Sequence, residues 1–372
     1  MTRIESIHAD RGATFTARGG RRVVDHYGRP ERAHRAVRNG VGVVEHVPGI
    51  LVVEGADRRE YVDNVVSNRV PATDGEGCYA LLLEPQGRIE LACYVYDAGE
   101  RLLVFTPPGL ETDLAADWRE KVFIQDVDIG VATDEFAVFG VCGPRATEAV
   151  ASVFAGPSVP DRPLSFVRGS VDGAGVTVVR SDGLTGEEGY DLICAAADAA
   201  AVYETLTSRG ELPAPFGYRT WESLTLEAGT PLFASELEGR IPNVLGVRNA
   251  LDFEKGCFVG QEVVSRVENR GQPSQRLVGL TLESDPDDAL PDPDDALPDP
   301  GAAVVDVETS VGEVTRALVS PSLERPLALA LVDFGLEETA LTVRTASEET
   351  PATLTDLPFV EGSARSARLP TY

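Results

Sequence analysis

The spacing of hydrophobic and polar residues predicts alternating helices and strands over most of the chain. In residues 56–66, apolar side chains recur at helical spacing, which favours an amphipathic helix. Residues 78–105 are rich in strand-forming types, and turns at 85–87 and 97–99 divide them into strands. Further helices are expected at 30–39, 110–118, 144–151 and 218–228, and further strands at 41–53, 175–180 and 190–194.

The last hundred or so residues show a different pattern, with short alternating runs that predict a small all-β domain. These runs flank residues 284–301, which contain the heptapeptide DPDDALP twice in tandem. Such a segment has too little apolar surface for a core, so we expect a solvated, disordered loop. A calcium site is the alternative, but the segment lacks the glycine and terminal glutamate of an EF-hand loop.

The charge balance narrows the classes of partner. The chain has 60 acidic and 33 basic residues, a formal net charge of −27, and only two of the basic residues are lysines, Lys121 and Lys255. Such a surface repels phosphate backbones and anionic membranes, so we expect neither nucleic acid nor membrane as a partner. At about 1 M salt the screening length falls to roughly 3 Å, which relieves the self-repulsion and favours a halophilic origin.

Location and metal binding follow from the N-terminus, the cysteines and the histidines. The first residues lack the apolar segment of a secretory signal, and no apolar run approaches the roughly 20 residues of a membrane span, so a cytoplasmic protein is expected. The histidines are irregularly spaced and no Cys-x-x-Cys pair occurs, so we expect no metal site. Four cysteines lie in or beside strand-like segments and are expected to be buried: Cys78, Cys93, Cys142 and Cys194.

The segment LDFEKGCFVGQEVVSRVENRG, residues 251–271, carries the most specific candidate chemistry. Cys257 lies in the loop that enters a helix expected at 261–269, and Lys255 precedes it by two residues. A nearby ammonium and a helix N-terminus both lower the pKa of a thiol and make it reactive. From local chemistry alone, a reactive thiol and an inert packed thiol remain equally open.

The order Lys-Gly-Cys-Phe-Val-Gly-Gln-Glu resembles the signature of the YgfZ family, the folate-binding relatives of the glycine cleavage T-protein, an aminomethyltransferase. The motif residues are Cys257 with Gly256, Gly260, Gln261 and Glu262. Further blocks resemble the family in the same order along the chain, at 52–58, 79–89, 143–146, 184–191 and 224–229.

The resemblance implies an α+β fold, a T-protein-like ring of α+β subdomains around a central folate site, followed by a C-terminal β-barrel. We expect an N-terminal folate-binding subdomain at 1–135 and a second α+β subdomain at 136–273 that ends in the cysteine motif. The barrel is expected at 274–372 and includes the acidic loop.

The resemblance also implies that the T-protein places an aspartate beside the folate nitrogen that receives the one-carbon unit. A carboxylate there can position or protonate the reacting amine. Alignment on residues 87–89 puts Ala92 at this position, and Ala92 can do neither. Glu90 shares a strand face with Ala92, but their Cα atoms are about 6–7 Å apart, too far for a simple replacement.

The folate-binding residues implied by the resemblance are Tyr79, Asp191, Arg219 and Trp221. Asp191 stands where the T-protein has a glutamate that hydrogen-bonds the pteridine ring, and a shorter carboxylate can still accept such bonds. Leu184 replaces a second pocket tyrosine. Trp221 replaces an arginine for which the nearby Arg219 could compensate, and plain packing is an equal alternative for Tyr79 and Trp221.

The expected function is therefore the YgfZ role, a tetrahydrofolate-binding protein that supports assembly or repair of iron–sulfur enzymes. Its partners would be iron–sulfur assembly proteins or client enzymes, and Cys257 with Lys255 would be the functional pair. Two alternatives stay open: an aminomethyltransferase or other folate-dependent one-carbon transferase, and a binding module that has lost folate. Whether the protein is an enzyme is left open by Ala92.

Overall fold

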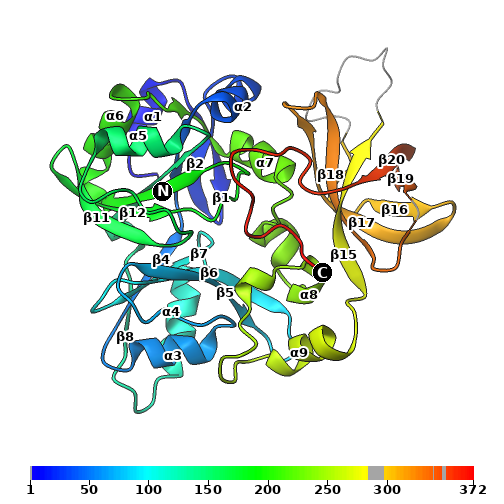
Figure 1. Ribbon diagram of the computed structural model, residues 1–372, viewed down its shortest axis with the longest axis horizontal. Helices are drawn as coiled ribbons and strands as arrows, with labels where there is room; N and C mark the ends of the chain where they lie inside the picture. The colour runs from blue at the N-terminus through cyan, green and yellow to red at the C-terminus, as the bar shows by residue number, and fades with distance from the viewer. Residues whose placement is uncertain (1, 284–296, 338, 346–348) are drawn as a thin grey trace.

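A computed structural model describes residues 2–283, 297–337, 339–345 and 349–372 of the 372-residue chain. Figure 1 shows two α/β units on one side and a β-barrel on the other, with a helical segment between them. The α+β class and the C-terminal barrel expected from the sequence are confirmed. Most of the acidic loop, residues 284–296, lies outside the described residues.

The first α/β unit is a five-stranded sheet with the order β5-β6-β7-β4-β8. Helices α3 (Arg58–Val65) and α4 (Glu111–Glu120) cover one face, where Tyr61 packs edge-on against Trp118. Because side chains alternate along a strand, the side chains on the opposite face of the sheet point toward the centre of the molecule. The strands are β4 (Gly49–Glu54), β5 (Glu76–Leu83), β6 (Ile89–Asp97), β7 (Leu102–Thr106) and β8 (Asp128–Val131).

The second unit is a seven-stranded sheet with the order β10-β11-β12-β13-β9-β3-β14. Helices α1 (Glu5–Asp10), α5 (Ala146–Val153) and α6 (Ala199–Ser208) pack on one face around the buried Phe139 and Tyr203. Its strands are β3 (Gly42–His46), β9 (Phe136–Cys142), β10 (Phe154–Ala155), β11 (Phe166–Val171), β12 (Ala174–Arg180), β13 (Gly189–Ala195) and β14 (Ala214–Pro215).

The chain does not complete one sheet before it begins the other. Strand β3 pairs with β9 in the second sheet, whereas β4, three residues later, joins the first sheet. The subdomain boundary expected at 135 therefore lies between β8 and β9 along the chain, but the first 46 residues contribute a strand to the second sheet. The physical reason is hydrogen bonding: the buried strand β9 needs a partner on both edges.

The segments that frame the two sheets are the N-terminal hairpin and a run of short helices. The hairpin consists of β1 (Thr14–Arg18) and β2 (Arg21–His26), and it is followed by α2 (Pro30–Asn39). The expected helix at 218–228 is α7 (Tyr218–Glu227), and the helix after the cysteine motif is α9 (Gln261–Arg270). Between them lie a π-helical turn at Phe233–Leu237 and α8 (Pro242–Leu245), with 3-10 turns elsewhere at Thr133–Glu135, Ala196–Asp198 and Arg248–Ala250.

The barrel closes in the order β15-β18-β17-β16-β19-β20, so no strand edge of it is left unpaired within the described residues. Its interior is filled by aliphatic side chains such as Leu280, Val314 and Ala330. The strands are β15 (Gln275–Leu282), β16 (Ala303–Asp306), β17 (Thr309–Ser320), β18 (Arg325–Asp333), β19 (Ala340–Arg344) and β20 (Glu349–Thr355).

After β20 the chain leaves the barrel and returns to the second α/β unit (Figure 1). The backbone N–H groups of Ala364 and Ala367 donate to the carbonyls of Gly186 and Asp182 in the loop before β13. Gly362 lies so close to this loop that a Cβ there would stand 2.1 Å from the Gly186 oxygen. We name residues 356–372 the C-terminal segment; its hydrophobic pattern is too weak to have been predicted from the sequence.

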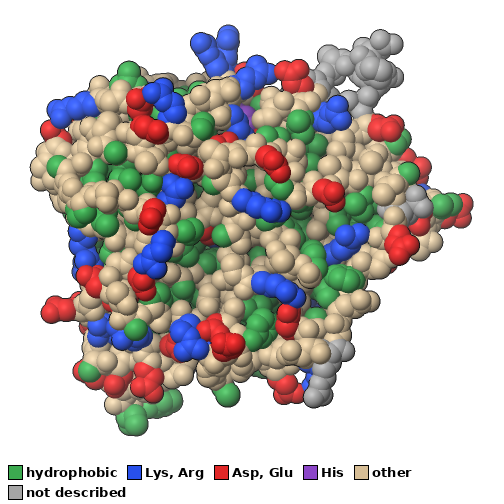
Figure 2. All heavy atoms as spheres, in the orientation of Figure 1, with side chains coloured by type: hydrophobic (Ala, Val, Ile, Leu, Met, Phe, Trp, Pro, Cys, Tyr) green, Lys and Arg blue, Asp and Glu red, His purple; other side chains and the backbone are tan. Residues whose placement is uncertain are grey.

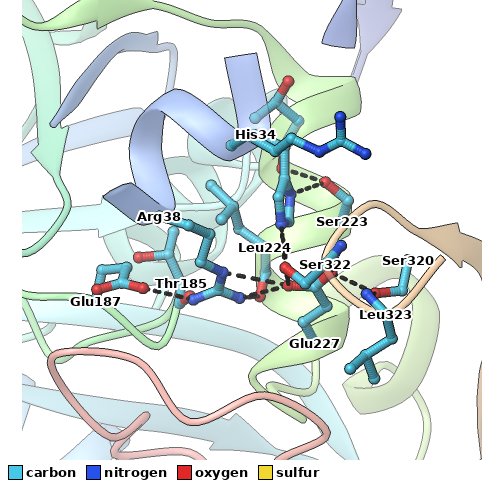
Figure 3. A network of polar contacts seen from close by, with 12 residues as sticks. His34, Arg38, Thr185, Glu187, Ser223, Leu224, Glu227, Ser320, Ser322 and Leu323 are labelled. Carbon is cyan, nitrogen blue, oxygen red and sulfur yellow. Dashed lines mark hydrogen bonds and ion pairs between the residues drawn. The ribbon is translucent and has the colours of Figure 1, made fainter. Parts of the chain in front are cut away.

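A buried network of charged side chains holds these units together (Figure 3). Arg38 of α2 donates to Glu227 of α7 at 2.9 Å and to Glu187 at 2.8 Å, and His34 Nε2 lies 3.0 Å from the Glu227 carboxylate. Burial acts to raise the pKa of Glu227, but the hydrogen bonds and charges of His34, Arg38 and Ser320 outweigh it and lower the pKa to about 2.

The same network reaches the barrel and the C-terminal segment. Glu227 accepts hydrogen bonds from Ser320 Oγ at 2.5 Å and from the Ser322 backbone at 3.1 Å, both in the turn between β17 and β18. Glu187 accepts from the Ser363 backbone at 2.9 Å. Five segments therefore meet at two carboxylates: α2, the loop before β13, α7, the β17–β18 connection and the C-terminal segment.

Candidate functional site

The two sheets, α7 and the C-terminal segment enclose a cavity of about 250 Å³. This is near the low end of the ~300–1,000 Å³ usual for small-molecule sites. The wall is mainly aromatic, with a few polar groups that converge on it. Its chemically distinctive lining residues are His46, Tyr79, Ala92, Tyr94, Tyr96, Asp182, Leu184, Asp191, Tyr218, Trp221 and Arg368.

Strands β5 and β6 supply the aromatic wall. Tyr79 pairs with Tyr94 in register, and the three rings of Tyr79, Tyr94 and Tyr96 follow one another at centroid separations of 5.2 and 6.2 Å. The Tyr79 side chain is buried, yet its hydroxyl has no hydrogen-bond partner among the described residues. Burial raises the pKa of Tyr79 to about 12, so the hydroxyl keeps its proton.

The C-terminal segment brings a cation, Arg368, into this wall. Its guanidinium lies 4.0 Å from the Tyr79 ring centroid and donates a hydrogen bond to the Tyr94 hydroxyl. The Tyr94 hydroxyl in turn donates to Asp182 at 2.9 Å, and Arg368 Nε stands 3.8 Å from the same carboxylate. Burial raises the pKa of Asp182, while the charge of Arg368 opposes the shift. Arg368 Nε has no hydrogen-bond partner within the described residues.

The opposite wall carries a second carboxylate, Asp191 of β13. His46 Nε2 lies 4.0 Å from Asp191 Oδ1, and the His46 ring packs edge-on against Trp221 at 4.8 Å. Burial raises the pKa of Asp191 to about 7, and the nearby Asp182 adds to the shift. Burial lowers the pKa of His46 to about 4, so the imidazole is neutral at pH 7.

Three of the four expected folate-binding residues, Tyr79, Asp191 and Trp221, line the cavity. Arg219 does not line it. It lies on α7 with its side chain 43% exposed, and its Nε is 3.5 Å from Asp25. The cavity's cation is instead Arg368, from a part of the chain that the sequence did not connect with the site.

Ala92 lines the cavity, as the alignment with the resembling family predicts, and Glu90 does not. Glu90 is exposed, so it offers no carboxylate to the site. The cavity is nevertheless not short of carboxylates, because Asp182 and Asp191 both line it. The hairpin supplies no carboxylate beside Ala92, and Asp182 comes instead from the loop before β13.

The cysteine motif lies outside the cavity lining. Cys257 is exposed, whereas the other four cysteines are buried as expected. The Lys255 ammonium donates to three backbone carbonyls at and just after the end of α3, those of Asp63, Val66 at 2.8 Å and Asn68 at 3.0 Å. Burial lowers the pKa of Lys255, and the Asp63 carboxylate at 3.6 Å opposes the shift. Within the described residues, no hydrogen bond or ion pair joins Lys255 to Cys257.

The remaining motif residues have local structural contacts. Gly260 has φ 78° at the start of α9, and a Cβ there would stand 2.6 Å from the Glu84 carbonyl oxygen, so only glycine lets this turn approach the hairpin. Glu262 pairs with Arg266 one turn along α9 at 2.6 Å. The Gln261 backbone N–H donates to Phe258, and a Cβ on Gly256 would meet no neighbour. The functional role expected for these residues stays a prediction.

Sequence reasoning missed His46, Asp182 and Arg368. His46 is one of the irregularly spaced histidines, for which the sequence predicts no metal site, and it lies in the cavity wall because the chain crosses from one sheet to the other directly after β3. Asp182 lies two residues before the block at 184–191 that resembles the family, and this proximity is the one signal that could have found it. No feature of the sequence indicates Arg368 as a cavity residue, because its position depends on the path of the C-terminal segment.

No helix of the described residues is long and apolar enough to span a membrane. Among the same residues, no group of three or more histidine, cysteine or acidic side chains is arranged to hold a metal ion.

The fold and the cavity define an α+β protein with a central cavity and an appended barrel. Two family models match it: the GCVT N-terminal domain over residues 4–255 and the glycine cleavage T-protein C-terminal barrel domain over residues 275–361. The chain therefore belongs to the glycine cleavage T-protein family, whose aminomethyltransferases use tetrahydrofolate.

The similarity to known aminomethyltransferases extends along nearly the whole chain. The chain is 31% identical to the aminomethyltransferase of Cutibacterium acnes over 381 residues, which covers 97% of this chain and 98% of that one. It is also 31% identical to the aminomethyltransferase of Geobacillus kaustophilus, with 89% and 90% coverage. The crystal structure of aminomethyltransferase T of the glycine cleavage system from Bartonella henselae has the same fold, with a TM-score of 0.83 at 21% identity and 98% coverage of both chains.

Proposed function

We propose that this chain binds tetrahydrofolate in the central cavity and transfers a one-carbon unit to or from it, as an aminomethyltransferase-type enzyme. The observation that carries the proposal is a set of polar groups in the cavity wall that form no hydrogen bond with the described residues: the buried Tyr79 hydroxyl and Arg368 Nε, and the partly exposed Asp191 carboxylate. An unpartnered buried polar group costs about 1–3 kcal/mol, and a bound ligand with matching groups removes that cost.

The cavity suits a reduced pterin. Its flat ring can pack on the tyrosines of β5 and β6, and its 2-amino-4-oxopyrimidine edge carries two adjacent N–H donors for a carboxylate. Asp191 is the carboxylate placed for that edge. Asp182 is the carboxylate we assign to the end of the folate that carries the reacting nitrogen. It accepts a hydrogen bond from Tyr94, which lies on β6 two residues from Ala92. When bound, the folate would supply the nitrogen that carries the one-carbon unit, while Asp182 would hold or move a proton there.

Calorimetric titration with tetrahydrofolate, followed by assay with an aminomethylated carrier protein, tests the proposal. Both experiments use molar KCl. We expect binding and formation of methylene-tetrahydrofolate. The variant Asp182→Asn should keep most of the binding and lose at least about tenfold in turnover, while the exposed control Glu90→Gln should change neither. An absence of binding would overturn the folate assignment, and binding without transfer by the unaltered protein would overturn the transferase assignment.

A second candidate is the support of iron–sulfur enzymes, and the observation that favours it is the exposure of Cys257. It is the one exposed thiol among the five cysteines, and the neighbouring Val259 side chain is also 48% exposed, so both are available to a partner. In a strain that lacks the gene, the unaltered protein should restore iron–sulfur enzyme activity and Cys257→Ala should not, with Cys194→Ala as the buried control. Full restoration by Cys257→Ala would overturn a role of the thiol.

A further inference from the structure

The Asp191 carboxylate has an unusual environment for an acid whose side chain is only 31% exposed. It faces the cavity, and no hydrogen bond to its oxygens is found within the described residues. Arg368 is the one lysine or arginine among the described lining residues, and its charge is already matched by Asp182 at 3.8 Å. Asp191 therefore has no countercharge, and a buried carboxylate without one takes up a proton.

His46 is the one polar neighbour that approaches Asp191. Its Nδ1 lies 3.4 Å from the Tyr218 hydroxyl, which can donate its proton there. When Tyr218 donates to Nδ1, the ring proton of the neutral imidazole is on Nε2, the atom that lies 4.0 Å from Asp191 Oδ1. Packing against Trp221 fixes the plane of the ring. His46 Nε2 thus lies near one carboxylate oxygen, beyond direct hydrogen-bond distance, and the second oxygen is left for a ligand.

Resting on the proposed function, we propose that His46 is a positioning residue that orients Asp191 for the pterin edge, and that ligand binding is coupled to loss of the Asp191 proton. A 2-amino-4-oxopyrimidine presents an N–H and an NH₂ side by side, and an ionised carboxylate accepts both, whereas a protonated one has a donor where an acceptor is needed. No bond is made or broken other than to this proton, which passes to solvent as the ligand binds.

The other titratable groups that face Asp191 keep their charge state around neutral pH. Burial raises the pKa of Tyr218 and of Cys142 to about 12, and that of Tyr96 well above its ordinary value. The pKa of His46 is lowered to about 4. Asp182 is the remaining acid and is paired with Arg368 and Tyr94. Asp191, with a pKa of about 7, is thus the group that titrates in this range without a countercharge.

The experiment measures the Kd of tetrahydrofolate from pH 6 to pH 8 in molar KCl. Because the ionised fraction of Asp191 rises about tenfold between these limits, the Kd should fall by about the same factor. Asp191→Asn should bind more weakly at pH 8 and show no such pH dependence, which also reports any titration of the ligand itself. A Kd that is independent of pH in the unaltered protein would overturn the coupling and leave the folate assignment standing.

Variants of His46 separate positioning from folding. His46→Phe fills the same space without the N–H, and we expect a weaker Kd at pH 8 and a pH midpoint that moves upward. His46→Gln restores an N–H donor and should recover part of both effects. The matched control is His26→Phe, since His26 stands 3.7 Å from Asp25 outside the cavity lining and should have no influence. A midpoint unchanged in His46→Phe would overturn the positioning role.

A ligand without the glutamate tail shows which end of the folate is recognised. With 6-methyltetrahydropterin, which keeps the ring edge, the same pH dependence of the Kd should appear. A dependence seen with tetrahydrofolate alone would overturn recognition of the ring. If neither compound binds at any pH, both the folate assignment and this inference fail.

Discussion

At the scale of single residues, Lys255 shows that proximity along the chain is a poor guide to partners in space. The lysine precedes Cys257 by two residues, but its ammonium donates to three carbonyls at the end of α3. The last carbonyls of a helix have no partner in the helix itself, and an ammonium satisfies several of them at once. Lys255 therefore makes the contacts of a helix cap. Lys255 and Cys257 are close in the sequence, but no contact joins their side chains within the described residues.

Replacing Lys255 by methionine should destabilise the protein by about 2–4 kcal/mol, because three carbonyl oxygens lose their donor. Replacing the exposed Cys257 by alanine should change stability by less than about 0.5 kcal/mol. Urea denaturation in molar KCl, followed by tryptophan fluorescence, measures both. Equal effects of the two substitutions would contradict the capping role.

Asp191 leads to a prediction for the protein without ligand. Its folded-state pKa of about 7 lies above the ordinary 3.8 of the unfolded chain, so folding favours the protonated form. This contribution to stability is complete below pH 3.8 and is lost as the pH rises through 7. Asp191→Asn stays neutral at every pH, so its stability relative to the unaltered protein should rise by about 2–3 kcal/mol between pH 5 and pH 8. Thermal unfolding at the two pH values checks this, and an equal difference at both would argue against the buried acid.

At the scale of elements, the periodic segments could be predicted and the non-periodic connections could not. Helices α2 and α7 and the strands β5 and β6 lie where the hydrophobic spacing indicates, because each buries one face. The C-terminal segment buries only scattered residues such as Leu369, so its return to the second unit leaves no periodic pattern. Its place is set by the loop before β13 and by the network around Glu187 and Glu227.

The buried network around Glu187 and Glu227 should contribute strongly to the free energy of unfolding. Arg38→Met leaves two buried carboxylates without their cation, and the expected cost is about 3–5 kcal/mol of unfolding free energy. The matched control lies one turn away on the same helix: Arg35 forms an exposed pair with Glu324 at 2.8 Å, and Arg35→Met should cost about 0.5 kcal/mol or less. Urea denaturation compares the two. A small effect of Arg38→Met would show that the units do not depend on this network.

At the scale of the whole molecule, the net charge of −27 is spread over a surface of mixed sign. Figure 2 shows arginine or lysine side chains interspersed with acidic ones on one face of the protein. Neighbouring charges of opposite sign attract, but the excess of acids still repels over longer distances. Salt shortens the range of that repulsion, from a screening length of about 10 Å at 0.1 M to about 3 Å at 1 M.

Stability should therefore rise with salt. Between 0.1 and 2 M KCl we expect a gain of at least about 1 kcal/mol in unfolding free energy, steepest below about 0.5 M, where the screening length changes fastest. Thermal or urea unfolding at stepped KCl concentrations measures the gain. A stability that is flat or falls with salt would contradict the halophilic origin that the composition favours.

The sequence by itself determined many of the periodic helices and strands, the barrel and the T-protein-like family, because periodic burial and motif order are local properties of the chain. It also predicted three cavity residues, Tyr79, Asp191 and Trp221, through the resemblance. Only the tertiary structure decided which charges meet. It brought Arg368 to Asp182 and His46 to Asp191 from strands, loops and a terminus far apart in the chain. Electrostatic partners depend on distance in space, and no pattern along the sequence contains that distance.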